Sequence, residues 1–152
     1  MQVFIHKADP RAIMPTCAYE GTSAAFDISC IEDTVIPARA SAIVPNGLNV
    51  TIPQEQPYYM MVHLRSSAGF KKDLICHPGV IDAGYTGDLG VKVYNLGDED
   101  VIIRANDRYA QLTVHRKEDV TLFLVDDQMW APFAALQKRG DSGFGSSGNK
   151  IQ

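Results

Sequence analysis

The feature that most constrains this chain is the repeated interruption of short apolar runs by turn-forming residues. Some runs alternate apolar with polar residues, as in Gly90-Val91-Lys92-Val93-Tyr94. Such alternation, bounded by Gly, Pro, Asn and Asp, is typical of half-buried β-strands. We expect strands over residues 3–6, 26–30, 41–44, 48–52, 58–64, 89–94, 101–103, 109–114 and 120–125.

Helical signals are sparse by comparison. Residues 66–72 predict one short helical turn with Ser66 or Ser67 as its N-cap. The tripeptide Pro45-Asn46-Gly47 predicts a turn, because Pro fixes φ while Asn and Gly tolerate a positive φ. The pattern as a whole favours an all-β sandwich or barrel.

Composition excludes several classes of protein. The 152 residues suit one domain, and 45% hydrophobic with 21% charged residues excludes a mainly disordered chain. No apolar run is long enough for a membrane span. The net charge of −4 argues against a broad nucleic-acid surface but leaves room for a local anion site. Cys17, Cys30 and Cys76 lack metal-site spacing, so we expect reduced thiols and a cytoplasmic protein.

The C-terminal residues differ in composition from the rest. We expect a β domain over residues 1–138 and a mobile Gly/Ser-rich tail over 139–152. The alternative is a linker with no function of its own. Arg139 and Phe144 argue against that alternative, because they give the tail one charged and one aromatic side chain that could anchor it. The Arg139-Gly140-Asp141 match to a cell-adhesion tripeptide lacks an export signal to support it.

Three further segments carry groups that suit phosphate or sugar chemistry. Arg65-Ser66-Ser67 joins a guanidinium to two hydroxyls and suits phosphate oxygens, unless it is only a helix cap with a surface arginine. Residues 79–88 suggest a hairpin that presents Asp82 and Tyr85 to a ligand. The alternative is that Asp82 only forms an Asx turn and that Tyr85 is a core residue. Arg108 and Gln111 lie at the start of a predicted strand, where both could reach a ligand. The simpler interpretation is that Arg108 is an exposed charge in a turn and Gln111 a glutamine on the sheet surface.

Familiar catalytic signatures are missing from the sequence. It has no phosphate-binding Gly-x-x-x-x-Gly-Lys-[Ser/Thr] loop, no zinc-deaminase motif and no Gly-x-Ser-x-Gly elbow. The candidate groups must therefore belong to a different kind of site.

The order and spacing of five short segments resemble the trimeric deoxyuridine triphosphatases (dUTPases). Together they extend over most of the chain. The five segments are residues 24–28 (AAFDI), 65–69 (RSSAG), 79–87 (GVIDAGYTG), 107–112 (DRYAQL) and 139–148 (RGDSGFGSSG).

The resemblance implies a jelly-roll-like β fold and a homotrimer whose three active sites each draw on all three chains. It implies hydrolysis of dUTP to dUMP and pyrophosphate by water that attacks the α-phosphorus, with Mg²⁺ on the triphosphate. Such a dUTP diphosphatase supplies dUMP for thymidylate synthesis and keeps uracil out of DNA. No nucleic acid or membrane partner is implied, although a viral member could contact a host protein and work in the host cytoplasm or nucleus.

The resemblance also implies roles for single residues. Asp82 would activate the water, and Tyr85 would lie under the deoxyribose and exclude a 2′-hydroxyl. Ser66 would contact the bridge between the α- and β-phosphates, and Asp27 would hold the hydrated Mg²⁺ through water. Arg139 would pair with the γ-phosphate and Phe144 would cover the uracil. The other implied substrate contacts are Arg65, Ser67, Gly79, Val80, Ile81, Arg108, Gln111, Gly145, Ser146 and Ser147.

Departures from the family pattern leave these groups in place. Leu64 and Asn106 stand where glycine is usual, and Asn tolerates the left-handed conformation that glycine would supply. Phe26 stands where tyrosine or a small residue is common.

Two other functions remain as alternatives to the dUTPase hypothesis: a dCTP deaminase and a non-enzymatic binding module. The related dCTP deaminases need a glutamate where this chain has Lys92, and a lysine cannot act as that base at neutral pH. A non-enzymatic binding module would use extra segments such as residues 98–100 or 126–136. An acidic turn and a core Trp130 are the simpler interpretations of those segments.

Overall fold

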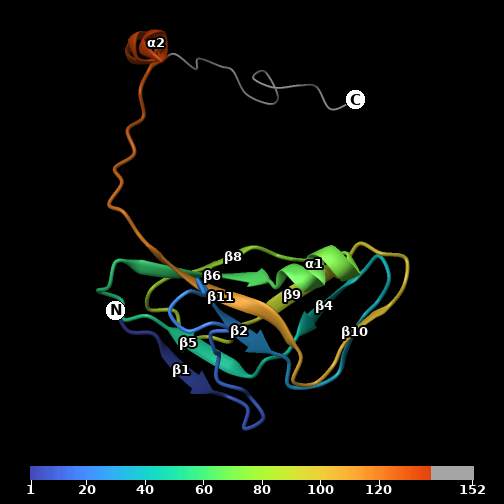
Figure 1. The fold of residues 1–152 in the computed structure, drawn as a ribbon. Helices are drawn as coiled ribbons and strands as arrows, with labels where there is room; N and C mark the ends of the chain where they lie inside the picture. The colour runs from blue at the N-terminus through green and yellow to red at the C-terminus, as the bar shows by residue number, and fades with distance from the viewer. Residues whose placement is uncertain (138–152) are drawn as a thin grey trace. The chain divides into compact units, whose positions relative to one another are not determined.

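Antiparallel strands make up most of the regular structure in the computed structural model, which describes residues 1–137 (Figure 1). This confirms the all-β expectation. The chain divides into two units, Met1–Glu118 and Asp119–Gln152, and the first contains the strands. The elements are β1 (Phe4–Lys7), β2 (Ala25–Ser29), β3 (Thr34–Ile36), β4 (Ser41–Val44), β5 (Leu48–Thr51), β6 (Tyr58–Leu64), α1 (Ser66–Lys72), β7 (Leu74–Cys76), β8 (Gly79–Ile81), β9 (Val91–Asn95), β10 (Val101–Ile103), β11 (Arg108–Arg116) and α2 (Asp127–Leu136).

The strands form four sheets, and the largest has the order β2-β11-β6-β8. Its central strand β11 pairs with β2 on one side and with β6 on the other. The remaining sheets have the orders β4-β9-β7, β1-β5 and β10-β3. Segments that lie far apart in the sequence therefore become neighbours around β11.

Alternating side chains supply the hydrophobic core, as the sequence pattern predicts. On β9, Val91 and Val93 are buried while Lys92 between them is exposed. Side chains from all four sheets join one buried cluster, which includes Ile36, Leu48 and Leu112. The three cysteines are free, in agreement with the expected reduced thiols.

The turn at residues 45–47 is confirmed, but its asparagine works differently from the prediction. Gly47 has φ +67°, and a Cβ there would lie 2.7 Å from the Cβ of Asp9. Asn46 does not adopt a positive φ. Instead its buried side chain accepts a hydrogen bond from the Leu48 amide and donates to the carbonyl of Leu89. The buried amide therefore ties two loops together.

The predicted helix over residues 66–72 is confirmed, but its predicted N-cap is wrong. Arg65 occupies the N-cap position, and its side chain makes no capping hydrogen bond. Ser66 and Ser67 lie inside the first turn, so their hydroxyls are not used as caps. The helix ends at Asp73, which adopts φ +50°.

The second unit departs from two predictions. Residues 120–125 form no strand, and no ladder in the described part of the chain includes them. The helix α2 was not predicted. It begins where the Asp126 carboxylate accepts a hydrogen bond from the amide of Met129, and it contains Pro132. Trp130 is 61% exposed and not a core residue. Neither helix in the described part of the chain has the length and apolarity of a membrane span.

We expect Asn46→Ala to lower the free energy of unfolding by about 1–3 kcal/mol, because it leaves buried backbone groups without partners. Urea unfolding at one fixed protein concentration measures this change. Asn49→Ala is the matched control, since the Asn49 side chain bonds to His6 in an exposed position. An equal loss in both variants would contradict the structural role of Asn46.

Candidate functional site

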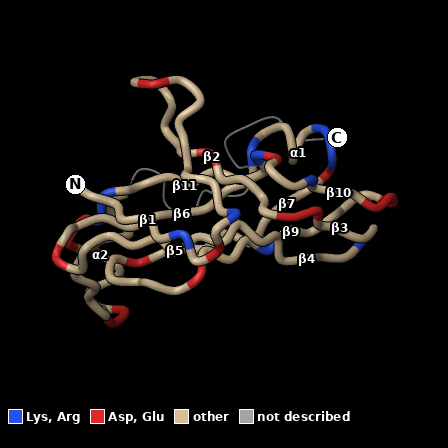
Figure 2. The backbone as a smooth tube through the Cα atoms, turned by 90° about the horizontal axis from the view of Figure 1, so that it is seen from below, with Lys and Arg blue, Asp and Glu red and all other residues tan. Residues whose placement is uncertain are grey.

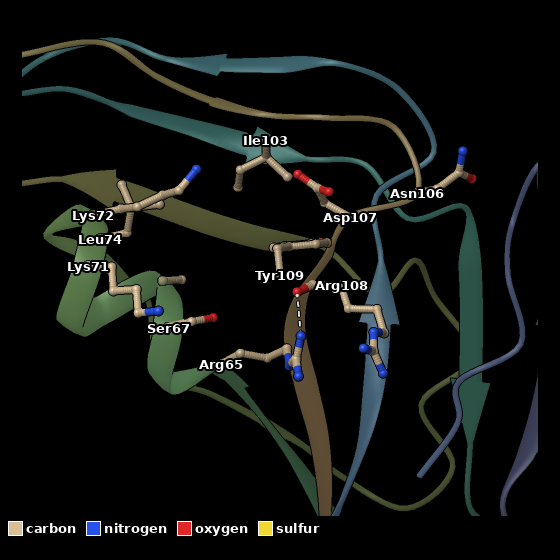
Figure 3. Close-up of a pocket in the computed structure, with 11 residues that line it drawn as sticks. Arg65, Ser67, Lys71, Lys72, Leu74, Ile103, Asn106, Asp107, Arg108 and Tyr109 are labelled. Atoms are coloured by element: carbon tan, nitrogen blue, oxygen red, sulfur yellow. Dashed lines mark hydrogen bonds between the residues drawn. The ribbon is translucent and has the colours of Figure 1, made fainter. Parts of the chain in front are cut away.

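Four basic residues gather where β6 ends and β11 begins. Arg65 follows β6, Lys71 and Lys72 lie in the last turn of α1, and Arg108 opens β11 (Figures 2 and 3). They line a cavity of about 400 Å³, which we call the basic pocket. Its other lining residues are Ser67, Ala68, Leu74, Ile103, Asn106, Asp107 and Tyr109. The concentration of positive charge suits an anion such as a phosphate chain.

The two arginines of the basic pocket are tied to each other and to Asp27. The Arg65 Nη1 donates to the carbonyl oxygen of Arg108 over 3.3 Å. One Asp27 oxygen lies 3.2 Å from the Nε of Arg65, and the other lies 3.1 Å from the Nη1 of Arg108. Asp27 is only 7% exposed, so this carboxylate depends on its two cationic partners.

The register of the large sheet explains why these groups meet. Gln111 of β11 lies opposite Asp27 of β2 and opposite His63 of β6. Arg65 stands two residues beyond His63, and Arg108 stands three residues before Gln111. Antiparallel pairing therefore returns both arginines to the same end of the sheet. Gln111 is in register with Asp27 but does not line the basic pocket.

The floor of the basic pocket is held by Tyr109. This residue is buried, and its hydroxyl donates to the carbonyl oxygen of Val44 over 2.9 Å. Burial raises the pKa of the Tyr109 phenol well above its ordinary value, so the hydroxyl stays neutral and keeps this bond. Asn106, which also lines the basic pocket, has φ +70°. This asparagine therefore adopts the left-handed conformation that the sequence predicted for it.

A second hollow, of about 280 Å³, forms where β8 ends, and we call it the hairpin hollow. The predicted site residues Val80, Ile81, Asp82 and Tyr85 line it, together with Asp88, Leu89 and Gly90. The structure therefore brings together the carboxylate and the aromatic ring that the sequence placed on one hairpin.

Residues 79–88 do not form the predicted hairpin, because β8 pairs with β6 and not with the chain that follows it. The ring of Tyr85 instead folds back onto the loop after β8. Its hydroxyl donates to the carbonyl oxygen of Asp88 over 3.0 Å. A Cβ at Gly87 would lie 2.7 Å from the Tyr85 Cζ and still closer to the hydroxyl oxygen. Gly87 is therefore required for this ring position, while the φ of +82° at Gly84 shapes the turn before it.

The basic pocket and the hairpin hollow lie at opposite ends of β6. Ile81 pairs with Met60, and Asp82 follows Ile81 directly. Met60 is five residues from Arg65, which corresponds to roughly 17 Å along a strand. One chain therefore keeps Asp82 well apart from Arg65 and Arg108.

Several predicted residues need separate mention. Ser67 lines the basic pocket, whereas Ser66 is exposed in the same helical turn without lining it. Gly79 lies on β8 and pairs with Val62. The predicted tail residues lie outside the described residues; they are Arg139, Phe144, Gly145, Ser146 and Ser147.

Among the residues of the basic pocket that sequence reasoning missed, two are basic, Lys71 and Lys72. The signal was available, because two adjacent lysines close the only helix predicted from the sequence, directly after Arg65-Ser66-Ser67. Lys71 follows Ser67 by four residues, which places both on one face of α1, and Lys72 lies next to Lys71 in the pocket wall (Figure 3).

The geometry around Asp27 does not fit direct coordination of Mg²⁺ by its carboxylate. Both carboxylate oxygens already face guanidinium groups, and the side chain is almost completely covered. Across residues 1–137, no three His, Cys, Asp or Glu side chains come together as a metal site. The assignment of Asp27 to the metal stays a prediction of the family resemblance, and the geometry pairs it with arginines.

Lys92, which stands at the position of the deaminase glutamate, lies outside both cavities. Its side chain is on the exposed face of β9, with Nζ 5.4 Å from the ring centroid of Tyr94. This cation–π contact gives the lysine a structural partner.

Comparison with known proteins identifies the family of this chain. The dUTPase family model matches residues 11–148. A deoxyuridine 5′-triphosphate nucleotidohydrolase of Mycobacterium marinum is 38% identical over 145 residues, which covers 93% of this chain and 92% of the relative.

Solved structures show the same fold. The dUTPase of Staphylococcus bacteriophage 80alpha, solved with dUpNHpp, is 26% identical with a TM-score of 0.84, covering 97% of this chain and 99% of that one. The dUTPase of phage phi11 of S. aureus, which coordinates a structural Mg(II) ion, is 23% identical with a TM-score of 0.74, covering 84% and 98%. With a family model that spans most of the sequence and a relative of such similarity over nearly its whole length, the chain belongs to the dUTPase family.

Proposed function

We propose that this protein is a dUTP diphosphatase, which hydrolyses dUTP to dUMP and pyrophosphate through attack of water on the α-phosphorus. The observation that carries the proposal is the hairpin hollow, where a carboxylate, an aromatic ring and a strand edge converge. Family membership supports the same reaction.

The edge of β8 suits the recognition of a pyrimidine. Within residues 1–137, β8 pairs with β6 on one side only, so its other edge keeps unpaired backbone N–H and C=O groups. Uracil presents alternating acceptors and a donor, which can pair with the backbone of Gly79, Val80 and Ile81. A close fit to this edge would reject the methyl group of thymine.

In the hairpin hollow, Asp82 activates the water and Tyr85 selects the sugar. The Asp82 carboxylate accepts a proton from water and directs its oxygen toward the α-phosphorus, so that the P–O bond to the leaving pyrophosphate breaks in line. Tyr85, 45% exposed, presents its ring to the deoxyribose and fills the volume that a 2′-hydroxyl would need.

The basic pocket suits the triphosphate. Phosphate oxygens repel a nucleophile, so the site must neutralise their charge and stabilise the leaving pyrophosphate. Arg65 and Arg108 supply positive charge, and Ser66 and Ser67 supply hydroxyl donors at the start of α1. Gln111 provides an amide donor near them. The Mg²⁺ that the family uses would arrive on the triphosphate, as part of the substrate.

We propose a homotrimer in which each site combines groups from different chains. Asp82 follows Ile81, whose partner Met60 already lies roughly 17 Å from Arg65 along β6, too far for both side chains to act on one α-phosphate. A second copy that brings its basic pocket to the hairpin hollow of the first would remove this gap. Arg139, Phe144, Gly145, Ser146 and Ser147, assigned by family resemblance, would complete the site over the γ-phosphate and the uracil.

The direct test is pyrophosphate release with dUTP, dCTP, dTTP and UTP in the presence of Mg²⁺. We expect release from dUTP alone. Asp82→Asn should lower kcat by about 10²–10⁴ because the general base is lost, with the Kd for dUTP nearly unchanged. Asp98→Asn, which removes an exposed carboxylate paired with Arg39, is the control. Turnover retained in Asp82→Asn would contradict the proposed base.

The shared site predicts complementation between two inactive variants. Asp82→Asn and Arg65→Ala chains, co-expressed with different tags and purified on both, should form mixed trimers with about one working site in three. Each parent assembly should be inactive, because every site lacks one group. Mixed assemblies as inactive as their parents would mean that Asp82 and Arg65 of one site come from the same chain.

Gly87→Ala tests the position of the Tyr85 ring. The added methyl group collides with the phenol and displaces the ring, so exclusion of a 2′-hydroxyl weakens. The preference for dUTP over UTP, measured as a ratio of kcat/KM values, should fall about tenfold. Gly69→Ala, in α1, meets only ordinary contacts and should leave the ratio unchanged. An unaltered ratio in Gly87→Ala would separate Tyr85 from sugar selection.

A further inference from the structure

A buried carboxylate lies behind the wall of the basic pocket. Asp27 is the third residue of β2, and its side chain is 7% exposed. An ionised carboxylate in such a position is stable only with close partners of opposite charge. Both of its oxygens have one, at 3.2 Å to Arg65 and 3.1 Å to Arg108.

The three members of this cluster come from three separate segments. Asp27 belongs to β2, Arg65 follows β6 and Arg108 opens β11, so the cluster crosses three adjacent strands of the four-stranded sheet. Arg65 also donates to the backbone carbonyl of Arg108. The carboxylate and this hydrogen bond together restrict both guanidinium groups.

Each arginine keeps donors for a ligand after these contacts. A guanidinium carries five N–H donors in a rigid plane. Arg65 uses its Nε side on Asp27 and part of Nη1 on Arg108, and Arg108 uses part of its own Nη1 on Asp27. Both side chains line the basic pocket, where the remaining donors can meet phosphate oxygens (Figure 3).

We propose that Asp27 is a positioning residue, whose carboxylate holds Arg65 and Arg108 in place for the phosphate chain and does not coordinate the metal directly. Free arginine side chains would lose rotamer freedom when the substrate binds. Asp27 restricts them before binding, so the loss is smaller when phosphate arrives. The inference rests on the proposed function, because it names what Asp27 does for the same phosphate site.

The test separates the arginines from the metal by removing the metal. Binding of inorganic pyrophosphate to the full-length protein is measured by calorimetry in EDTA, for the wild type and for Asp27→Asn. We expect Asp27→Asn to weaken this metal-free binding about tenfold, because an amide does not attract two guanidinium groups. The Mg²⁺ concentration that gives half-maximal dUTP hydrolysis should stay unchanged.

Asp33→Asn is the matched control. Asp33 also pairs with an arginine, since its Oδ2 lies 2.6 Å from the Nη1 of Arg104, but it lies outside both cavities. It should bind pyrophosphate like the wild type. The opposite pattern in Asp27→Asn would overturn the proposal: metal-free binding as tight as in the wild type, with a raised Mg²⁺ requirement.

A second variant covers loss of folding in Asp27→Asn. Asp27→Glu keeps the charge but moves the carboxylate by one methylene, so pyrophosphate binding in EDTA should weaken while the urea transition is retained. Unchanged binding in a folded Asp27→Glu would also overturn the positioning role. If the wild type releases no pyrophosphate from dUTP, the proposed function fails, yet the metal-free comparison still decides what Asp27 does.

Discussion

The pairing of β11 with both β2 and β6 determines where the groups of the basic pocket and Asp27 lie. Because the pairing is antiparallel on both sides, the start of β11 meets the end of β6, and Arg108 comes to stand beside Arg65. The same register sets Gln111 opposite Asp27. A slip of one residue would turn these side chains to the other face of the sheet and separate the carboxylate from its arginines. The phosphate site therefore depends on strand register more than on any local motif.

Much of the fold followed from the sequence, because alternation and turn chemistry are local. The strands over 41–44, 58–64 and 101–103 and the helix over 66–72 were predicted with the observed bounds. The three-residue strands β3 and β7 were not predicted, and β8 was predicted only as part of a hairpin, since so few residues seldom show a clear period. Residues 120–125 show the reverse problem: the strand pattern is present, but a strand forms only beside a partner.

The candidate site divides in the same way. Asp82 and Tyr85 share one short loop, so their meeting in one hollow could be predicted from nine consecutive residues. The partners of Asp27 could not, because fourteen lysines and arginines were available and only the sheet register selects two of them. Lys71 and Lys72 were overlooked for a related reason, since their place at the pocket depends on how α1 leaves β6.

The cluster of Asp27, Arg65 and Arg108 also bears on how such a chain can diverge. These residues belong to three segments that are separated by dozens of positions, yet the loss of any one leaves charge uncompensated in or beside a covered position. Drift at one of them is tolerated only with a compensating change at another. Among descendants of this chain, the three positions should be inherited as a unit, although nothing in the linear order of the sequence connects them.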